Sequence, residues 1–233
     1  MLLRRAGTPL VALALLAAPA LAGCGGGSDE SPSQLLSRAK TTLDDARSVH
    51  FLLDSDNAPT TGTALLGGEG DVLRPSSFDG TLKVLTGGST VDLGVISVGG
   101  TVYVKLPFLG GYSVVDPAQY GLGDPGALLD PDTGISQLLA KAEDPELGDE
   151  KRVDGEVVRE VTARLPGDLV QQVLTSQDPG KAVDARFAVA TDSGELRRAQ
   201  LTGPFFSAGD EATYTIELSD FGADVEITAP PTG

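Results

Sequence analysis

The sequence predicts an α+β protein built on a predominantly antiparallel β-sheet. Apolar and polar residues alternate in many short segments that end at Gly-Gly or Asp-Gly, which is typical of antiparallel hairpins. Helical spacing of apolar residues is confined to a few short segments, and no alternating βαβ pattern or repeated unit is present. The composition agrees, because a chain of 233 residues with 30 Gly, one Met and no Trp favours a sheet with an aliphatic interior.

The chain begins with the features of an export signal. Arg4 and Arg5 form a positive region, and the 13 residues Pro9–Leu21 carry no charged or polar side chain. This run has the length of a signal peptide and is shorter than the about 20 residues that span a bilayer. Residues 1–23 are therefore predicted to be a signal peptide that is removed.

Cys24 follows this signal directly and is the only cysteine of the chain, so it cannot form an internal disulfide or a thiolate zinc cluster. The sequence Leu21-Ala22-Gly23-Cys24 resembles the lipobox of bacterial lipoproteins, in which the cysteine sulfur receives a diacylglyceryl group before cleavage. The resemblance implies that Cys24 becomes the first residue of the mature protein and carries acyl chains such as palmitate. An ordinary secreted protein whose signal ends near a cysteine is the alternative.

Residues 24–33 are predicted to form a flexible tether, because "GGGSDESPS" is too small and polar to offset its chain entropy. Removal of residues 1–23 leaves 233 − 23 = 210 residues. That length suits one domain, which we expect at residues 34–233.

The charge of the chain excludes some partners. Its formal net charge is −16, and loss of Arg4 and Arg5 makes it −18, since 15 basic residues then face 33 acidic ones. Such a surface repels phosphate backbones, so nucleic acid is not expected as a partner. It also repels anionic lipid head groups, so attachment to a membrane must come from acyl chains.

The first half of the mature chain predicts a helix followed by strands. Leucines and alanines between 35 and 46 recur at helical spacing, which predicts a helix at about 33–46. Residues 50–53, 64–73 and 77–85 read as strands. The segment "STVDLGVISVGGTVYVKLPF" at 89–108 is the strongest hairpin signal, with Gly99-Gly100 as its turn.

The second half is less regular. A short helix is expected at about 133–142, with Asp132 or Thr133 as its cap. A strand pair is expected to turn at Asp154-Gly155, a helix to follow near 168–176, and a hairpin to turn through residues 192–194. The segment "EATYTIELSDFGADVEITAPP" predicts two final strands around Phe221-Gly222.

Several of these segments resemble one family. The lipobox and tether, "GGSTVDLGVISVGGTVYVKLP", "LLDPDTGISQLLA", "VDGEVVREVTARLP" and "YTIELSDFGADVEITAPP" are similar to the actinobacterial lipoproteins typified by LppX, LprA, LprF and LprG. The resemblance implies a LolA- or LolB-like fold, a strongly curved antiparallel sheet (half-barrel) with helices on its concave side enclosing an apolar cavity. It also implies a carrier of acylated lipids or glycolipids, outside the cytoplasmic membrane and beside an export permease.

The strand alternation and the resemblance together nominate residues that line such a cavity. They are Leu82, Val84, Val91, Leu93, Val95, Val102, Val104, Leu106, Ile135, Leu138 and Leu139. The same aliphatic faces would equally build a filled core, so a cell-surface structural or interaction lipoprotein without lipid cargo remains the alternative function.

Neither an enzyme nor a resident cofactor is expected. His50 is the sole histidine and lies beside Phe51 on an apolar strand, which favours a structural role over that of a general base. Asp130-x-Asp132-x-Gly134 hints at a calcium loop, but its glycine comes one position early and Lys141 stands where a bidentate Glu is required. No metal site is predicted, and "DPDTG" is read as a turn and helix cap.

Overall fold

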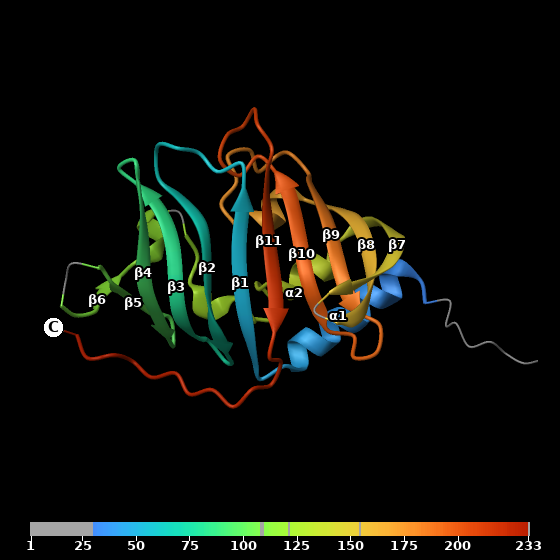
Figure 1. The fold of residues 1–233 in the computed structure, drawn as a ribbon, viewed down its shortest axis with the longest axis horizontal. Coiled ribbons are helices and arrows are strands. Elements are labelled where there is room, and N and C mark those ends of the chain that lie inside the picture. The colour runs from blue at the N-terminus through green and yellow to red at the C-terminus, as the bar shows by residue number, and fades with distance from the viewer. Residues whose placement is uncertain (1–29, 108–109, 121, 154, 233) are drawn as a thin grey trace, which may run out of the picture.

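The computed structural model describes residues 30–107, 110–120, 122–153 and 155–232 (Figure 1). The predicted signal peptide, Cys24 and most of the predicted tether lie outside these residues. Within them, no helix is long and apolar enough to cross a membrane.

Eleven strands form one open antiparallel sheet, in the order β6-β5-β4-β3-β2-β1-β11-β10-β9-β8-β7. Their bounds are β1 Ser48–Asp56, β2 Ala64–Leu73, β3 Ser77–Thr86, β4 Ser89–Val98, β5 Thr101–Lys105, β6 Ser113–Val115, β7 Glu143–Val153, β8 Glu156–Leu165, β9 Val183–Ala190, β10 Leu196–Gly203 and β11 Ala212–Ser219. The sheet thus consists of two meanders, β1–β6 and β7–β11, which join where β1 pairs with β11. The predicted α+β class with an antiparallel sheet is confirmed.

The helical segments lie on one face of this sheet (Figure 1). They are α1 Pro32–Asp45, η1 Pro117–Tyr120, η2 Pro125–Ala127, α2 Ser136–Ala140 and α3 Gly167–Val170. Since β6 and β7 are the two edge strands, the chain between them must cross the whole sheet, and it carries η1, η2 and α2 over this face. We call this crossing chain, residues 116–142, the crossover segment.

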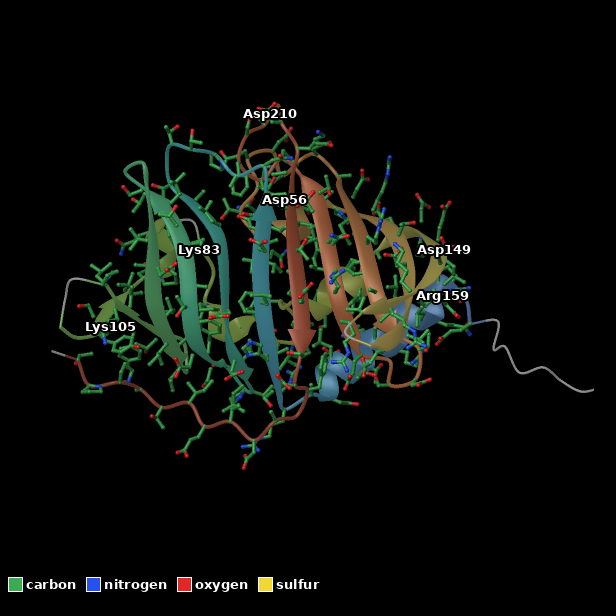
Figure 2. The ribbon with its side chains drawn as sticks, in the orientation of Figure 1. Asp56, Lys83, Lys105, Asp149, Arg159 and Asp210 are labelled. Atoms are coloured by element: carbon green, nitrogen blue, oxygen red, sulfur yellow. The ribbon has the colours of Figure 1, made fainter. Side chains whose placement is uncertain are left out.

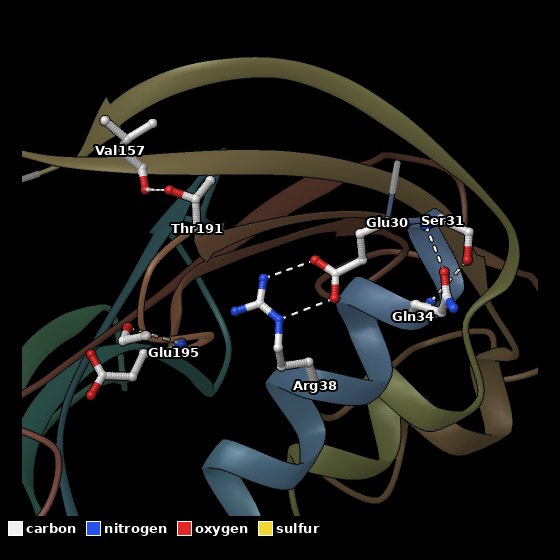
Figure 3. A network of polar contacts seen from close by, with 8 residues as sticks. Glu30, Ser31, Gln34, Arg38, Val157, Thr191 and Glu195 are labelled. Atoms are coloured by element: carbon white, nitrogen blue, oxygen red, sulfur yellow. Dashed lines mark hydrogen bonds and ion pairs between the residues drawn. The ribbon is translucent and has the colours of Figure 1, made fainter. Parts of the chain in front are cut away.

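Helix α1 begins at Pro32, inside the segment predicted as a tether. Ser31 caps it through a capping box, in which the Ser31 hydroxyl accepts from the Gln34 amide at 3.3 Å and the Ser31 amide donates to the Gln34 side chain at 2.9 Å (Figure 3). Arg38 reaches back to Glu30 at 2.9 Å and holds the pKa of that carboxyl below its ordinary value. In the sequence, the Ser-x-x-Gln spacing with Pro32 at the first helical position indicates that the helix begins here.

Helix α1 covers the second meander. Leu35, Leu36, Ala39 and Leu43 of α1 are buried in the hydrophobic core together with the inward residues of β8 to β11, and α1 packs against β7, β9, β10 and α2. The second meander is therefore backed by a packed core.

The strand predictions hold for the central elements. β2 has the predicted bounds 64–73, and β4 pairs with β5 through Val98 and Thr101, so that Gly99-Gly100 forms the turn with φ of +57° and +82°. Both values lie in the left-handed region, which glycine adopts without a steric cost.

The prediction of two final strands is wrong in its second half. β11 ends at Ser219, and residues 223–231 form no strand. Both sides of β11 are already paired, with β1 and with β10, so a strand returning from Phe221-Gly222 has no edge to join. The chain instead runs along one end of the sheet, and Thr232 makes a single parallel bridge to Tyr112 (Figure 1).

Two predicted helices are shorter than expected. The helix expected near 168–176 is only one turn, α3, followed by turns. α2 starts at Ser136 instead of about 133, and neither Asp132 nor Thr133 caps it. The Asp130 carboxylate accepts hydrogen bonds from the amides of Asp132 and Thr133, both at 2.9 Å, and these bonds fold "DPDTG" into a turn before the helix.

Candidate functional site

A cavity of about 950 Å³ lies under the first meander, on the face that carries the crossover segment. Its sheet wall is made by the inward side chains of β1 to β6 and β11. Nine of the residues nominated from the sequence lie on its wall: Leu82, Val84, Val91, Leu93, Val95, Val102, Val104, Leu106 and Ile135.

The register of the strands explains why these residues meet. Leu82 pairs with Leu93, Val84 with Val91, and Val95 with Val104. Residues paired across antiparallel strands point to the same face, and alternate residues along each strand do so too. The alternation read from the sequence therefore places one continuous aliphatic surface on this side of the sheet.

Leu138 and Leu139 are the exceptions. Neither is among the residues that line the cavity, and both are buried in the hydrophobic core, where α2 packs against α1. The prediction placed them on the cavity wall because their helical spacing marks an apolar face. Spacing alone does not say which partner covers that face.

Several charged side chains lie on the outer face of the sheet. Lys83 and Lys105 lie next to lining residues in sequence, and both are exposed on the face turned away from the helices (Figure 2). His50 also lies on this face, where its Nδ1 is 2.8 Å from Asp71 Oδ1. Asp71 pairs with His50 on one side and with Asp79 on the other. Burial and the nearby Asp71 carboxylate raise the pKa of Asp79.

Apart from Ile135, the wall opposite the sheet was missed by sequence reasoning. It is built by irregular segments: residues 122–128 and 133–135 of the crossover segment, residues 171–175 and Gln177, and Phe205 with Phe206. These segments have no periodicity from which a face could be read. The adjacent phenylalanines were the one available signal, because two large aromatic side chains in a loop need a surface to cover.

Three aromatic rings close one side of the cavity. The ring of Tyr214 lies 4.9 Å from that of Phe205 and 5.5 Å from that of Phe206, centroid to centroid. The Tyr214 hydroxyl donates to the main-chain oxygen of Leu65, and burial raises the pKa of this hydroxyl. It is therefore a neutral group whose hydrogen bond is already made within the protein.

The lining is almost free of ionic charge. Among the described lining residues, Asp124 is the one carboxylate, and it accepts a hydrogen bond from the Gly126 amide at 2.8 Å at the start of η2. The exposed lining residues with polar side chains carry hydroxyl or amide groups, whereas Leu106 and Pro107 are exposed apolar ones; the polar residues are Thr61, Thr63, Thr86, Ser113, Thr133, Gln171, Gln172 and Gln177. The site therefore has an apolar interior and an uncharged rim that carries most of its hydroxyl and amide groups. Such a site suits a long apolar ligand better than an ion.

Comparisons with known proteins agree with one another. A model of the LppX_LprAFG lipoprotein family matches residues 31–227. The lipoarabinomannan carrier protein LprG of Mycobacterium tuberculosis is 27% identical over 231 residues, which cover 95% of this chain and 94% of that protein. The protein of the same name from Mycolicibacterium hassiacum is 29% identical over 237 residues, which cover 96% and 97% of the two chains.

Two solved structures share the fold. LprF from Mycobacterium bovis superposes with a TM-score of 0.72 at 22% identity, over 87% of this chain and 97% of that one. The lipoprotein LppX of Mycobacterium tuberculosis superposes with a TM-score of 0.63 at 18% identity, over 86% of this chain and 100% of that one.

Proposed function

Because the chain belongs to the LppX_LprAFG lipoprotein family, we propose that it is a cell-envelope lipoprotein that binds the acyl chains of lipids or glycolipids in its cavity and carries them within the envelope. In this proposal the ligand lies between a curved sheet and the helices on its concave side, the arrangement that the resemblance implies. The observation that carries the proposal is the cavity of about 950 Å³ with its aliphatic lining.

The aliphatic lining can supply the free energy of binding such a ligand. Each lipid methylene moved from water into an apolar cavity contributes about 0.8 kcal/mol and requires no charged partner. The lining offers many aliphatic contacts, while its polar interior groups, Tyr214 and Asp124, already have partners within the protein. Affinity in this proposal therefore comes from the acyl chains. The hydroxyl and amide groups of the rim contact the glycerol or sugar group of the lipid.

The proposal includes an anchor. Cys24 would carry the acyl chains that hold the mature protein in the outer leaflet of the cytoplasmic membrane, with the residues after it as tether. The support for this is the signal-like run that precedes Cys24 and the family's description as lipoproteins. An export permease that passes lipid to the cavity is part of the same proposal.

The alternative, an interaction lipoprotein with a filled interior, is disfavoured by the same cavity. Interiors of packed domains hold few voids larger than a water molecule. A void of about 950 Å³ lies within the range of 300–1,000 Å³ that is usual for ligand sites.

Titration with a pyrene-labelled acyl probe tests the proposal. The mature chain should bind the probe saturably, and a neutral acylglycerol should displace it. Serum albumin serves as the positive control for the probe. A mature chain that is folded by circular dichroism and binds no probe at any concentration would contradict the carrier function and leave the interaction protein.

A further inference from the structure

The cavity has an open end and a closed end. The exposed fraction falls from 43% for Leu106, directly after β5, to 4% for Val102 within β5. Along β4, Val91 and Leu93 are half-buried, whereas Val95 is 3% exposed. The open end therefore lies at the Leu106 and Val91 ends of these strands, and the depth of the cavity is measured toward Val95.

A single cross-strand row forms the closed end. Phe51 pairs with Gly70, Gly70 with Gly80, and Gly80 with Val95, so the row runs from β1 to β4. Phe51 and Val95 both line the cavity. The two glycines between them contribute no side chain, and this leaves a gap in the row.

Phe78 from the next row fills that gap. Its ring tip lies 2.9 Å and 2.7 Å from the positions that a Cβ would take at Gly70 and Gly80, so the ring can lie across the strands only because both residues are glycine. Phe78 is fully buried and meets Phe51 edge-to-face, with 6.3 Å between ring centroids. Phe51 thus lies between the cavity and the fully buried ring of Phe78.

Helix η2 covers the sheet beyond this row. Gly126 lies so close that a Cβ there would be 2.9 Å from the Ser97 hydroxyl and 3.1 Å from the main chain of Ser76. η2 packs on β2, β3 and β4. Over β1 to β4 the cavity therefore cannot extend past Val95 without moving either Phe51 or η2, and on β5 the lining ends one row further, at Val102.

We propose that Phe51 and Val95, with Val102 beside them on β5, form the floor of the cavity and set the longest acyl chain that it accepts in full. This inference rests on the proposed function and adds the specificity-determining residues to it. A chain that ends before the floor gains contacts with every added methylene. A longer chain must leave its excess methylenes outside in water.

The test uses the mature chain with Cys24→Ala, which retains every described residue. A series of saturated monoacylglycerols, from about 8 to about 24 carbons, competes with the pyrene-labelled probe. When the floor residues are unsubstituted, the affinity for the monoacylglycerol should rise about fourfold per methylene up to a limiting chain length and then stay constant. Phe51→Ala should move this limit to longer chains, and Val95→Phe should move it to shorter ones.

Leu218→Ala is the matched control. Leu218 pairs with Phe51 across the sheet and is 3% exposed, but it does not line the cavity. It should lower the melting temperature without moving the limiting length. Phe51→Leu provides a milder floor variant if Phe51→Ala does not fold.

The outcomes separate the two proposals. A limiting length that stays the same in the Phe51 variants and in Val95→Phe overturns the floor and leaves the carrier function in place. Absence of binding for every chain length in the unsubstituted protein overturns both.

Discussion

The hydroxyl of Tyr214 on β11 donates a hydrogen bond to the main-chain oxygen of Leu65 on β2, across the intervening strand β1. The pairing of β2 with β3 is irregular between Leu65 and Gly67, and a bulge of this kind leaves backbone groups outside the ladder. The bond therefore ties the two meanders together at the cavity wall.

Removal of this bond should destabilise the protein. Tyr214→Phe keeps the ring but leaves the half-buried Leu65 oxygen without this donor, which costs about 1–3 kcal/mol of unfolding free energy. Urea denaturation at pH 8 measures the loss. An unchanged unfolding midpoint would show that the bond contributes nothing.

Tyr214 should also make the free energy of unfolding depend on pH in the alkaline range. Burial raises the folded-state pKa of Tyr214 above its ordinary value of 10.0. The folded protein then keeps a proton that the unfolded chain releases, so this contribution is complete below about pH 10 and is lost as the pH rises above it, by about 1.4 kcal/mol per pH unit. The stability difference between wild type and Tyr214→Phe should shrink from pH 9 to pH 11; a constant difference would contradict the shift.

Arg74 caps the carboxyl end of α1 from outside the helix. Its Nε donates to the Ala46 oxygen at 2.9 Å and its Nη2 to the Leu43 oxygen at 3.2 Å, while the last turn of α1 has no basic residue of its own. Arg74→Ala should cost about 1–3 kcal/mol, because half-buried carbonyl groups lose a charged donor.

Arg47→Ala is the control for this substitution. The Arg47 ion pair with Asp224 is largely exposed, and such pairs contribute about 0–1 kcal/mol. Equal effects of the two substitutions in urea denaturation would argue against a capping role for Arg74.

Substitution by tryptophan distinguishes a cavity from a packed core. Leu82→Trp and Val104→Trp should reduce lipid binding severalfold with little change in melting temperature, because the added volume enters empty space. In a filled core the same changes would cost about 1–3 kcal/mol or more. Lys83→Trp and Lys105→Trp, one residue along on the outer face, should leave binding unchanged. Destabilisation by both inward substitutions, with no lipid in the wild type, would leave the interaction protein.

The proposed membrane anchor depends on a single thiol. Cys24→Ala should abolish lipidation and move the protein from the detergent phase to the aqueous phase, since the chain has no other cysteine to accept a diacylglyceryl group. Phase partitioning and the mass of the intact protein measure this. Equal partitioning and equal processing of both proteins would exclude Cys24 as the lipidation site.

The sheet wall from β3 to β5 could be predicted from the sequence, whereas the rest of the lining, Ile135 excepted, could not. Strict alternation fixes the face of Val91, Leu93 and Val95, and Gly99-Gly100 fixes the register of that hairpin. The pairing of β1 with β11 joins residues far apart in the chain, and no local pattern encodes it. The second predicted strand after Phe221 failed for this reason, because the position beside β11 was already taken.

The irregular wall depends on tertiary contacts. Phe205 and Phe206 line the cavity from a loop, and Gln171 and Gln172 do so from turns after α3. Leu138 and Leu139 show the converse, since their helical spacing is correct but α1 covers them. Periodicity identifies an apolar face, and only the packing of other elements decides whether that face is buried or lines a void.

The most direct test of the carrier function is mass spectrometry of solvent extracts from the mature protein purified out of a cell envelope. A lipid carrier should yield co-purified acylated lipid in near-stoichiometric amount with the wild type and the Lys83→Trp control, and much less with Leu82→Trp. A folded wild type that yields no acylated lipid, and takes up none when lipid is added, would contradict the carrier function.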